Sequence, residues 1–411
     1  MKRSRLMVAC LGLSAMLWDS PAVAFVQEVT ANFRPDPSNP NVNRFTNTTP
    51  VSGYCANAPA VCEYLNIFSI RMPVVFESSA PLAAVPTDPR QTSMWTVPVQ
   101  WRPLTVVNAF GEQETVEIRI SGIGSRYTLD RRVDEVVPGP VGMFDAHDRL
   151  WREGFWTAPS PCRAANSSGL GWTYVSFFWM TPQEGNCVKT AQFEIPSLRY
   201  DYTDIAYELR TPNPLGMSSG VYTGTLTYSI GPYQDFDMGD VMLPNDSALT
   251  LNFTLDVQHV LKVDIPPGGD RVELLPQGGW QAWLNRGRQP ARLFRDQTFR
   301  IHASSRFKMS LECGLEIGNT CALRNADGDE APVQLAVSLP GGISDQYGQP
   351  ANRRALRLDG AGTELFQPAR YISDRPGTLH FEVERDDVSD MLEYPGSTYA
   401  GVVTVVWDSE V

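Results

Sequence analysis

The sequence predicts an all-β protein built from sandwiches. Short runs of alternating apolar and polar residues recur along the chain, broken by Gly, Pro, Asn and Asp, which is typical of half-buried antiparallel strands. The 32 Pro and 32 Gly are spread throughout, and the long helical stretches that a doubly wound α/β enzyme needs are missing from the pattern. The clearest expected strands are Ile67 to Phe76, Thr115 to Ile120, Val188 to Ile195, Leu249 to Val257, Gln297 to Ile301, Leu335 to Leu339 and Leu379 to Val383.

Residues 1–24 have the features of a secretory signal peptide. Basic residues precede an apolar run from Leu6 to Trp18, and Ala22-Val23-Ala24 supplies the small-residue pattern that signal peptidase accepts. The run is shorter than the roughly 20 apolar residues that a membrane-spanning helix needs. We therefore predict export through the periplasm and a mature chain that begins at Phe25. Lipidation of Cys10, which lies in a weak lipoprotein-like context, stays an alternative.

The cysteines agree with an oxidising compartment. Because short loops are the easiest to close, neighbouring cysteines are the favoured partners, although many pairings are possible. No C-x2-C spacing of the kind that binds zinc occurs, so we predict no metal and no cofactor. The favoured disulfides are Cys55 with Cys62, Cys162 with Cys187, and Cys313 with Cys321.

Charge and histidine usage exclude further classes. The formal net charge of −12 argues against a nucleic-acid partner, since phosphates require clustered Lys and Arg. Of the four histidines, none lies in a metalloprotease or nucleophile motif. His147 lies between Asp145 and Asp148, a pattern more typical of a solvated loop than of an acid and base pair. We predict that the chain is not an enzyme, and a secreted β-sandwich glycosidase is the least implausible exception.

An internal repeat indicates two related domains. Gly220 to Tyr228 resembles Ser397 to Val405, with Tyr, Gly and Thr at matching places, as expected for a late strand of two immunoglobulin-like sandwiches. The Pro-Pro-Gly-Gly that starts at Pro266 cannot continue a strand ladder. We place an N-terminal domain at residues 25–258 and a C-terminal domain at residues 259–411.

Three segments carry a resemblance to a known family. The stretch from Thr211 through Gly224, the segment from Asp256 to Val263, and the closing Tyr399 to Val405 together resemble the CblD-type minor pilins. Those proteins are tip adhesins and assembly initiators of the cable pilus and of the colonisation-factor (alpha-clade) chaperone-usher fimbriae. The resemblance covers the last 200 residues or so, and residues 25–190 carry no motif of this family.

The resemblance implies a mechanism of assembly. The C-terminal domain of such pilins is an incomplete sandwich that lacks its last strand, and β-strand addition by a periplasmic chaperone and then by the major pilin fills it at the outer-membrane usher. Gly401 to Trp407 is expected to be a strand with an uncovered edge, an aggregation hazard without a chaperone. The implied contact residues are Gly401, Val402, Thr404, Val406 and the carboxylate of Val411.

A tip position also follows from the resemblance. A large domain precedes the pilin-like one and would block strand donation, although Phe25 to Phe33 alternates and could form a donor segment. We expect the N-terminal domain to bind a host glycan or protein receptor, with Arg71 matching one arginine of the family's receptor pocket. The aromatic and basic cluster around Arg152, Trp156 and Arg163 is a second candidate. For any single one of these residues, a structural role in the core is the favoured interpretation. A purely structural initiator, or a secreted β-sandwich binding module, remains the alternative.

Overall fold

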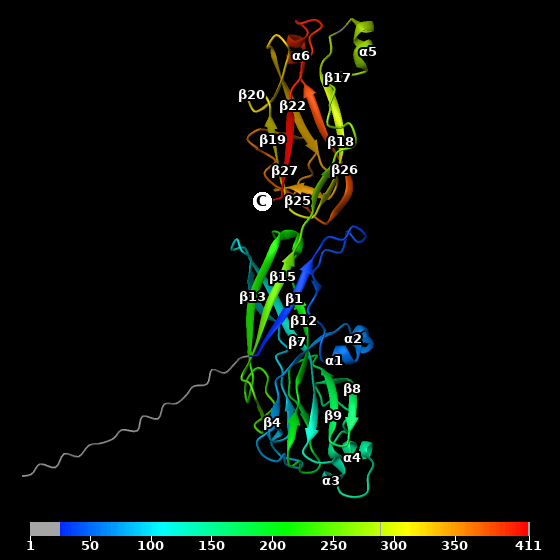
Figure 1. The fold of residues 1–411 in the computed structure, drawn as a ribbon, viewed down its shortest axis with the longest axis vertical. Coiled ribbons are helices and arrows are strands. Elements are labelled where there is room, and N and C mark those ends of the chain that lie inside the picture. The colour runs from blue at the N-terminus through cyan, green and yellow to red at the C-terminus, as the bar shows by residue number, and fades with distance from the viewer. Residues whose placement is uncertain (1–24, 288, 410–411) are drawn as a thin grey trace, which may run out of the picture.

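The computed structural model describes residues 25–287 and 289–409 of an elongated chain of β-sheets (Figure 1). Strands form most of its regular structure, so the all-β prediction is confirmed. The signal peptide predicted for residues 1–24, with Cys10, lies outside the described residues, as does Val411. In the described part of the chain, no helix combines the length and apolar character needed to cross a bilayer.

One large sheet contains most strands before residue 258, and its centre is the long strand β7 (Gln113–Leu129), which pairs with β6, β9, β11 and β12. The order along the sheet is β14-β4-β11-β7-β6-β13-β15-β1-β2, with β12 and β3, and β9 and β8, branching from β7. The other strands here are β1 (Phe25–Phe33), β2 (Thr46–Asn47), β3 (Phe68–Met72), β4 (Phe76–Ser78), β5 (Ser93–Trp95), β6 (Arg102–Val107), β8 (Arg163–Gly171), β9 (Tyr174–Met180), β10 (Cys187–Lys189), β11 (Leu198–Tyr200), β12 (Thr203–Arg210), β13 (Gly220–Ser229), β14 (Met242–Pro244) and β15 (Ala248–Val257).

Strand β15 is the last strand of this sheet in sequence and lies between β13 and β1. It pairs antiparallel with β13 over its whole length and parallel with β1 from Phe25 to Phe33. Alternate side chains of β15 point into the core, where each is at most 2% exposed: Leu249, Leu251, Phe253, Leu255 and Val257. The N-terminal sandwich is therefore closed at this side by its own strand.

The strands after residue 258 form separate sheets, and no strand pair described here joins them to the first sheet. The larger sheet has the order β16-β18-β26-β22-β21-β20, with β17 on β18 and β24 on β22, while β19 pairs with β27 and β23 with β25. The bounds are β16 (Leu261–Asp264), β17 (Leu275–Pro276), β18 (Leu293–Ala303), β19 (Lys308–Cys313), β20 (Glu316–Ile317), β21 (Thr320–Arg324), β22 (Glu330–Ser338), β23 (Ile343–Asp345), β24 (Arg354–Leu356), β25 (Phe366–Pro368), β26 (Ile372–Val383) and β27 (Val403–Asp408).

The apolar cores divide at the same place as the sheets. One cluster runs from Val29 to Val257 and another from Leu293 to Val388. We call the two parts the N-terminal region (residues 25–258) and the C-terminal region (residues 259–409); their independence as domains stays a prediction. The ring nitrogens of His259 lie 2.9 Å from Met217 O and 3.1 Å from Ser304 Oγ, so this residue connects both parts.

The two segments that resemble each other in sequence share a close backbone contact at their glycine. A Cβ atom at Gly224 of β13 would lie 2.4 Å from the carbonyl oxygen of Thr105, and one at Gly401, just before β27, would lie 2.5 Å from that of Ala322. Both glycines are therefore required because a neighbouring strand approaches too closely for a side chain. The glycine that recurs in the sequence repeat thus has the same steric cause in both regions.

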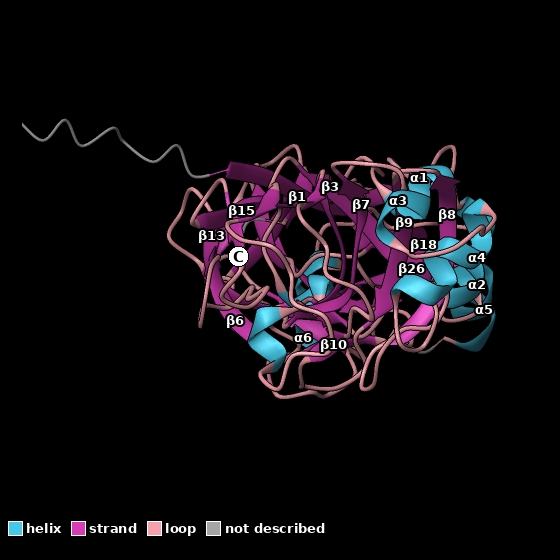
Figure 2. Cartoon of the chain, turned by 90° about the horizontal axis from the view of Figure 1, so that it is seen from below, coloured by secondary structure: helices cyan, strands magenta, loops and turns pink. Residues whose placement is uncertain are grey.

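Short helices, which the sequence analysis did not expect, cover loops of this scaffold, and most lie on one side of the molecule when it is viewed along its long axis (Figure 2). Their brevity left no long periodic pattern to detect, and the buried face of α4 consists of only Ala146, His147 and Leu150. The helices are α1 (Tyr54–Asn57), α2 (Pro59–Leu65), α3 (Val133–Val136), α4 (Met143–Leu150), α5 (Gly279–Arg286) and α6 (Arg385–Met391), with short 3-10 turns at Pro89–Gln91 and Pro214–Gly216.

One expected strand is largely wrong. The segment from Val188 to Ile195 is a strand only to Lys189, where β10 pairs with the three-residue strand β5. Beyond Lys189 the pairing is reduced to single bridges, Ala191 with Trp151 and Ile195 with Leu82, so no continuous ladder forms. The three disulfides join Cys55 with Cys62, Cys162 with Cys187, and Cys313 with Cys321, the pairs favoured from the sequence.

Candidate functional site

The last strand, β27, has a single strand partner in the described chain. It pairs antiparallel with β19, from Lys308 opposite Asp408 to Cys313 opposite Val403. Its counterpart in the N-terminal region, β13, has β6 on one side and the full length of β15 on the other. The outer side of β27 therefore lacks the strand that closes the N-terminal sandwich.

The register identifies the backbone groups on that outer side. The N–H of Gly314 donates to the carbonyl oxygen of Val402 at 2.9 Å. Because bonded and non-bonded pairs alternate in an antiparallel ladder, the backbone groups of Thr404 and Val406 point toward β19. The N–H and C=O groups that point away from β19 belong to Val403, Val405 and Trp407, and we call this set the open edge.

The side chains of the same three residues face the core. Val403, Val405 and Trp407 pack against the C-terminal cluster but remain partly exposed. The indole of Trp407 lies 5.1 Å from the Phe299 ring and 5.8 Å from the Phe307 ring, measured between ring centroids. An apolar strand with an unpaired edge is a template for another chain.

A second incompletely covered margin lies at the β16 end of the larger sheet, which does not contain β27. Strands β16 and β17 have β18 as their strand partner in the described residues. Leu261, Val263 and Leu274, in or next to these strands, are partly exposed although they pack on the same core as β27. The C-terminal core is thus covered less completely along both margins than in its centre.

The contact residues expected from the sequence lie around this edge. Gly401 and Val402 precede β27, and the side chain of Val402 is 67% exposed. Thr404 and Val406 lie within β27 on its outward face. Their role in binding a partner strand stays a prediction. The sequence analysis did not name the open-edge residues themselves, because the direction of each N–H depends on the register with β19.

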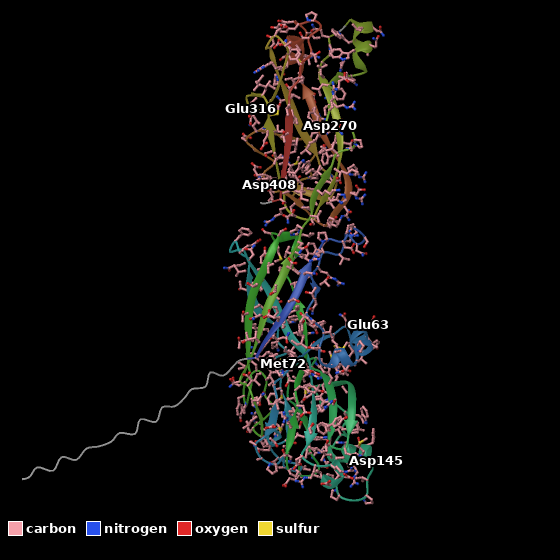
Figure 3. All side chains as sticks on the ribbon, in the orientation of Figure 1. Glu63, Met72, Asp145, Asp270, Glu316 and Asp408 are labelled. Atoms are coloured by element: carbon pink, nitrogen blue, oxygen red, sulfur yellow. A yellow bond between two sulfur atoms is a disulfide. The ribbon has the colours of Figure 1, made fainter. Side chains whose placement is uncertain are left out.

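The distal end of the N-terminal region carries exposed aromatic side chains. Figure 3 labels Asp145 of α4 at this end, far from Asp408. Phe144 and Trp156 are 47% and 43% exposed, and their ring centroids lie 5.8 Å apart. Phe155 lies beneath them, 3% exposed, with its ring centroid 4.5 Å from that of Trp156. We call Phe144, Arg152 and Trp156 the distal surface.

A buried lysine holds the loop that carries this surface. Lys189 of β10 is 4% exposed, and its Nζ donates to the carbonyl oxygens of Gly154 and Thr157. The backbone N–H of Arg152 donates to Thr190 O at 3.0 Å, which fixes the start of the loop to the same segment. Burial lowers the pKa of Lys189 from 10.5 to about 8.

The other two candidate receptor residues do not join the distal surface as one cluster. Arg71 in β3 donates to both carboxylate oxygens of Asp204, at 2.7 and 2.8 Å, and its guanidinium stacks over the Tyr202 ring. The neighbouring Met72 lies well away from Asp145 (Figure 3). Arg163 is exposed at the start of β8. Receptor binding by any of these residues stays a prediction.

His147, expected in a solvated loop, is instead fully buried in α4. Its Nδ1 lies 2.8 Å from the Tyr127 hydroxyl and its Nε2 lies 2.8 Å from Gly171 O. The apolar face of α4 turns this residue inward, and burial lowers its pKa. The expectation is therefore wrong, and His147 attaches α4 to the sheet.

One group of side chains follows the order of a nucleophile, base and acid. Ser338 Oγ lies 2.9 Å from His380 Nε2, and His380 Nδ1 lies 2.7 Å from Asp296 Oδ1. However, Ser338 Oγ also accepts the N–H of Arg353, whose guanidinium lies 3.2 Å from the same Nδ1. The three side chains come from β22, β26 and β18, so we interpret the group as a polar connection across neighbouring strands. Among the described residues, no cluster of three or more His, Cys, Asp or Glu could hold a metal ion.

Comparison with solved structures finds chains from two chaperone–tip adhesin complexes. One belongs to the complex described as vital for activation of CFA/I fimbriae biogenesis; the match covers 94% of this chain and 97% of that chain, at 10% identity and a TM-score of 0.23. The other belongs to the CsuC–CsuE pre-assembly complex of archaic Csu pili of Acinetobacter baumannii, with 94% and 99% covered, 10% identity and a TM-score of 0.22. No protein-family model and no curated protein matches the sequence. TM-scores this low carry no argument about function.

We predict that Lys189 makes stability depend on pH above 8. Below pH 8 the folded and unfolded chains both carry the proton, whereas between pH 8 and 10.5 only the unfolded chain keeps it. The free energy of unfolding of the wild type, relative to a Lys189→Met variant, should therefore rise with pH across this window by about 1–3 kcal/mol. Denaturant titrations of both proteins at pH 7, 8, 9 and 10 measure it. If the difference in unfolding free energy between the two proteins stays constant or falls with pH, Lys189 does not have a lowered pKa in the folded chain.

Proposed function

We propose that this chain is the tip subunit of a chaperone-usher fimbria and that the open edge of β27 accepts a donor strand. The observation that supports this is the comparison of the two repeats: β13 is paired on its second side by β15, whereas β27 is not paired there in the described chain. Strand addition would supply the missing partner, with main-chain hydrogen bonds for affinity and side chains for specificity.

The strand β15 indicates what a donor strand must provide. Strand β15 lies between β13 and β1, and its five inward side chains are fully buried in the core. Burying an apolar side chain stabilises a fold by about 1.5–3 kcal/mol. A donor with apolar residues at every second position would cover the partly exposed Val403, Val405 and Trp407 in the same way. Its backbone would pair with the N–H and C=O groups of these three residues.

A tip position is supported by the first strand. Phe25 to Phe33, considered as a donor segment, forms β1 and pairs with β15 along its whole length. Val29, Ala31 and Phe33 are at most 4% exposed, so withdrawing β1 would open the N-terminal core. A chain that uses its first strand internally accepts a strand but has none to donate from this segment.

The partners of the proposed role follow from the uncovered edge. A periplasmic chaperone would cover it after export, and the donor strand of the major pilin would replace the chaperone at the outer-membrane usher. Because the chain accepts without donating, it would start the fibre and be displayed at its tip on the bacterial surface. A structural initiator without receptor binding remains the second candidate.

Adhesion is the proposed role of the distal surface. Helix α4, which carries Phe144, lies at the end of the N-terminal region farthest from β27 (Figures 1 and 3), where a tip subunit would meet a host glycan or protein receptor. Trp156 contacts Phe144, and Arg152 is exposed on the loop that leads to Trp156. Exposed aromatic faces suit sugar rings, and an arginine suits their anionic substituents. This is the observation that favours an adhesin over an initiator alone.

Proline substitutions test the open edge. Val405→Pro removes an N–H that points away from β19, so the free protein should lose no ladder hydrogen bond, since Pro is tolerated on an unpaired edge. Its stability loss should be limited to the packing of the partly buried valine side chain. A peptide with the donor sequence of the cognate major pilin should bind this variant at least about tenfold more weakly than the wild type, because one hydrogen bond is lost and the ring obstructs pairing. Calorimetric titration and thermal melting measure both effects.

The matched control is Thr404→Pro. Its N–H points toward β19, so this variant should destabilise the free protein, by about 3 kcal/mol or more. Equal stability losses for the two variants, or equal peptide affinity for Val405→Pro and the wild type, would contradict the assignment of the open edge.

Replacing the distal aromatic residue tests adhesion. Trp156→Ala should reduce binding of the mature protein to host cells or glycan arrays at least about tenfold, as loss of a central aromatic contact does at other interfaces. Tyr64→Ala, at an 87% exposed tyrosine of α2, is the control and should bind normally. If wild-type protein binds no receptor while the donor peptide still binds, the initiator is the correct function.

A further inference from the structure

Helix α5 presents an apolar face that is incompletely covered in the described chain. Trp280, Trp283 and Leu284 have the i, i+3 and i+4 spacing of a single helix face. Trp280 is 37% exposed and Leu284 is 64% exposed, while the Trp280 and Trp283 ring centroids lie 5.7 Å apart. An isolated exposed leucine is ordinary, but adjacent tryptophans with a leucine on one helix face form the kind of cluster found at interface centres.

The backbone fixes α5 as a separate projection. It lies between β17 and β18 and packs mainly against the two-residue strand β17. Gly278 and Gly279 precede and begin it with φ values of 81° and 76°, and Gly287 ends it at 61°. These left-handed conformations favour glycine and turn the chain sharply at both ends of the helix. The apolar face is thus held at the tip of a short excursion from the sheet.

Its position relates it to the open edge. Helices α5 and α6 lie at the end of the C-terminal region farthest from the N-terminal region (Figure 1). The opposite end is covered by N-terminal residues, through His259 with Met217 and through Arg306, which lies 3.8 Å from Glu112. A subunit whose strand lies along β27 must have its folded body beyond one end of that strand. The free end, which carries α5, is the end that has room for it.

We propose that the apolar face of α5 binds the folded body of the subunit that donates its strand to β27. This inference rests on the proposed function. The face is continuous with the incompletely covered margin of the sheet, because Leu274 and Leu275 of the preceding segment are themselves half-buried. The occupant is therefore a pilin with an apolar patch next to the point where its donor segment joins the folded body, and α5 adds a contact outside the donor strand.

The experiment compares two probes on the full mature protein. One probe is the isolated donor peptide, and the other is a major pilin complemented in cis by its own added strand, with its N-terminal extension free. The double variant Trp280→Ser with Leu284→Ser should release the intact pilin at least tenfold faster than the wild type, and should hold the peptide unchanged. Tyr347→Ser, at a 78% exposed tyrosine of the same region, is the matched control and should behave as the wild type with both probes.

The outcomes separate this inference from the proposed function. Unchanged release of the intact pilin by the double variant overturns the role of α5 while leaving strand acceptance in place. Failure of the wild type to bind either probe overturns the proposed function itself. Concentration-dependent dimers of the wild type that the double variant abolishes, with pilin release unchanged, would show instead that a second copy of this chain occupies the face. Unchanged peptide binding also establishes that the double variant is folded.

Discussion

The unpaired side of β27 is the constraint on which the C-terminal region depends. A buried or half-buried strand must satisfy the N–H and C=O groups on both sides, and β19 satisfies only one set in β27. The side chains of Val403, Val405 and Trp407 are apolar and pack on the core without being fully buried. The same three residues therefore have unpaired backbone groups and incompletely covered apolar surface. The proposed strand addition would supply both the hydrogen bonds and the apolar cover.

The N-terminal region shows the complete form of the same arrangement. There β15 supplies the strand, β1 covers its other side, and the inward side chains of both are buried. Gly224 and Gly401, at matching places of the sequence repeat, are each approached closely by a carbonyl oxygen of another strand. One chain thus contains a sandwich closed by its own strands and a second one with an uncovered edge, which is the arrangement that the proposed tip subunit requires.

Much of this arrangement could be predicted from the sequence. Alternation predicted β15, β18 and β22, because side chains of a strand with one buried face repeat every two residues. The disulfide pairs followed from short loops, and the repeat around Gly224 and Gly401 located β13 and β27. These features are local, so neighbouring residues are sufficient to indicate them.

Features set by tertiary contacts could not be predicted in this way. The orientation of Val405 toward the open edge depends on its register with Leu311, which lies far away in sequence. The short helix α4 and the burial of His147 depend on contacts with Tyr127 and Gly171. The link between Lys189 and the loop around Trp156 is equally non-local. The sequence therefore indicated which residue types could bind a receptor, but not which of these residues lie together on one surface.

Amide hydrogen exchange at single-residue resolution in β27 tests the central claim most directly. In the free mature protein, the amides of Val403, Val405 and Trp407 should exchange much faster than those of Thr404 and Val406, which donate to β19. Adding the donor peptide should protect the fast set and leave the slow set unchanged. Equal protection of both sets in the free protein would show that β27 is already paired on both sides, and would contradict the account.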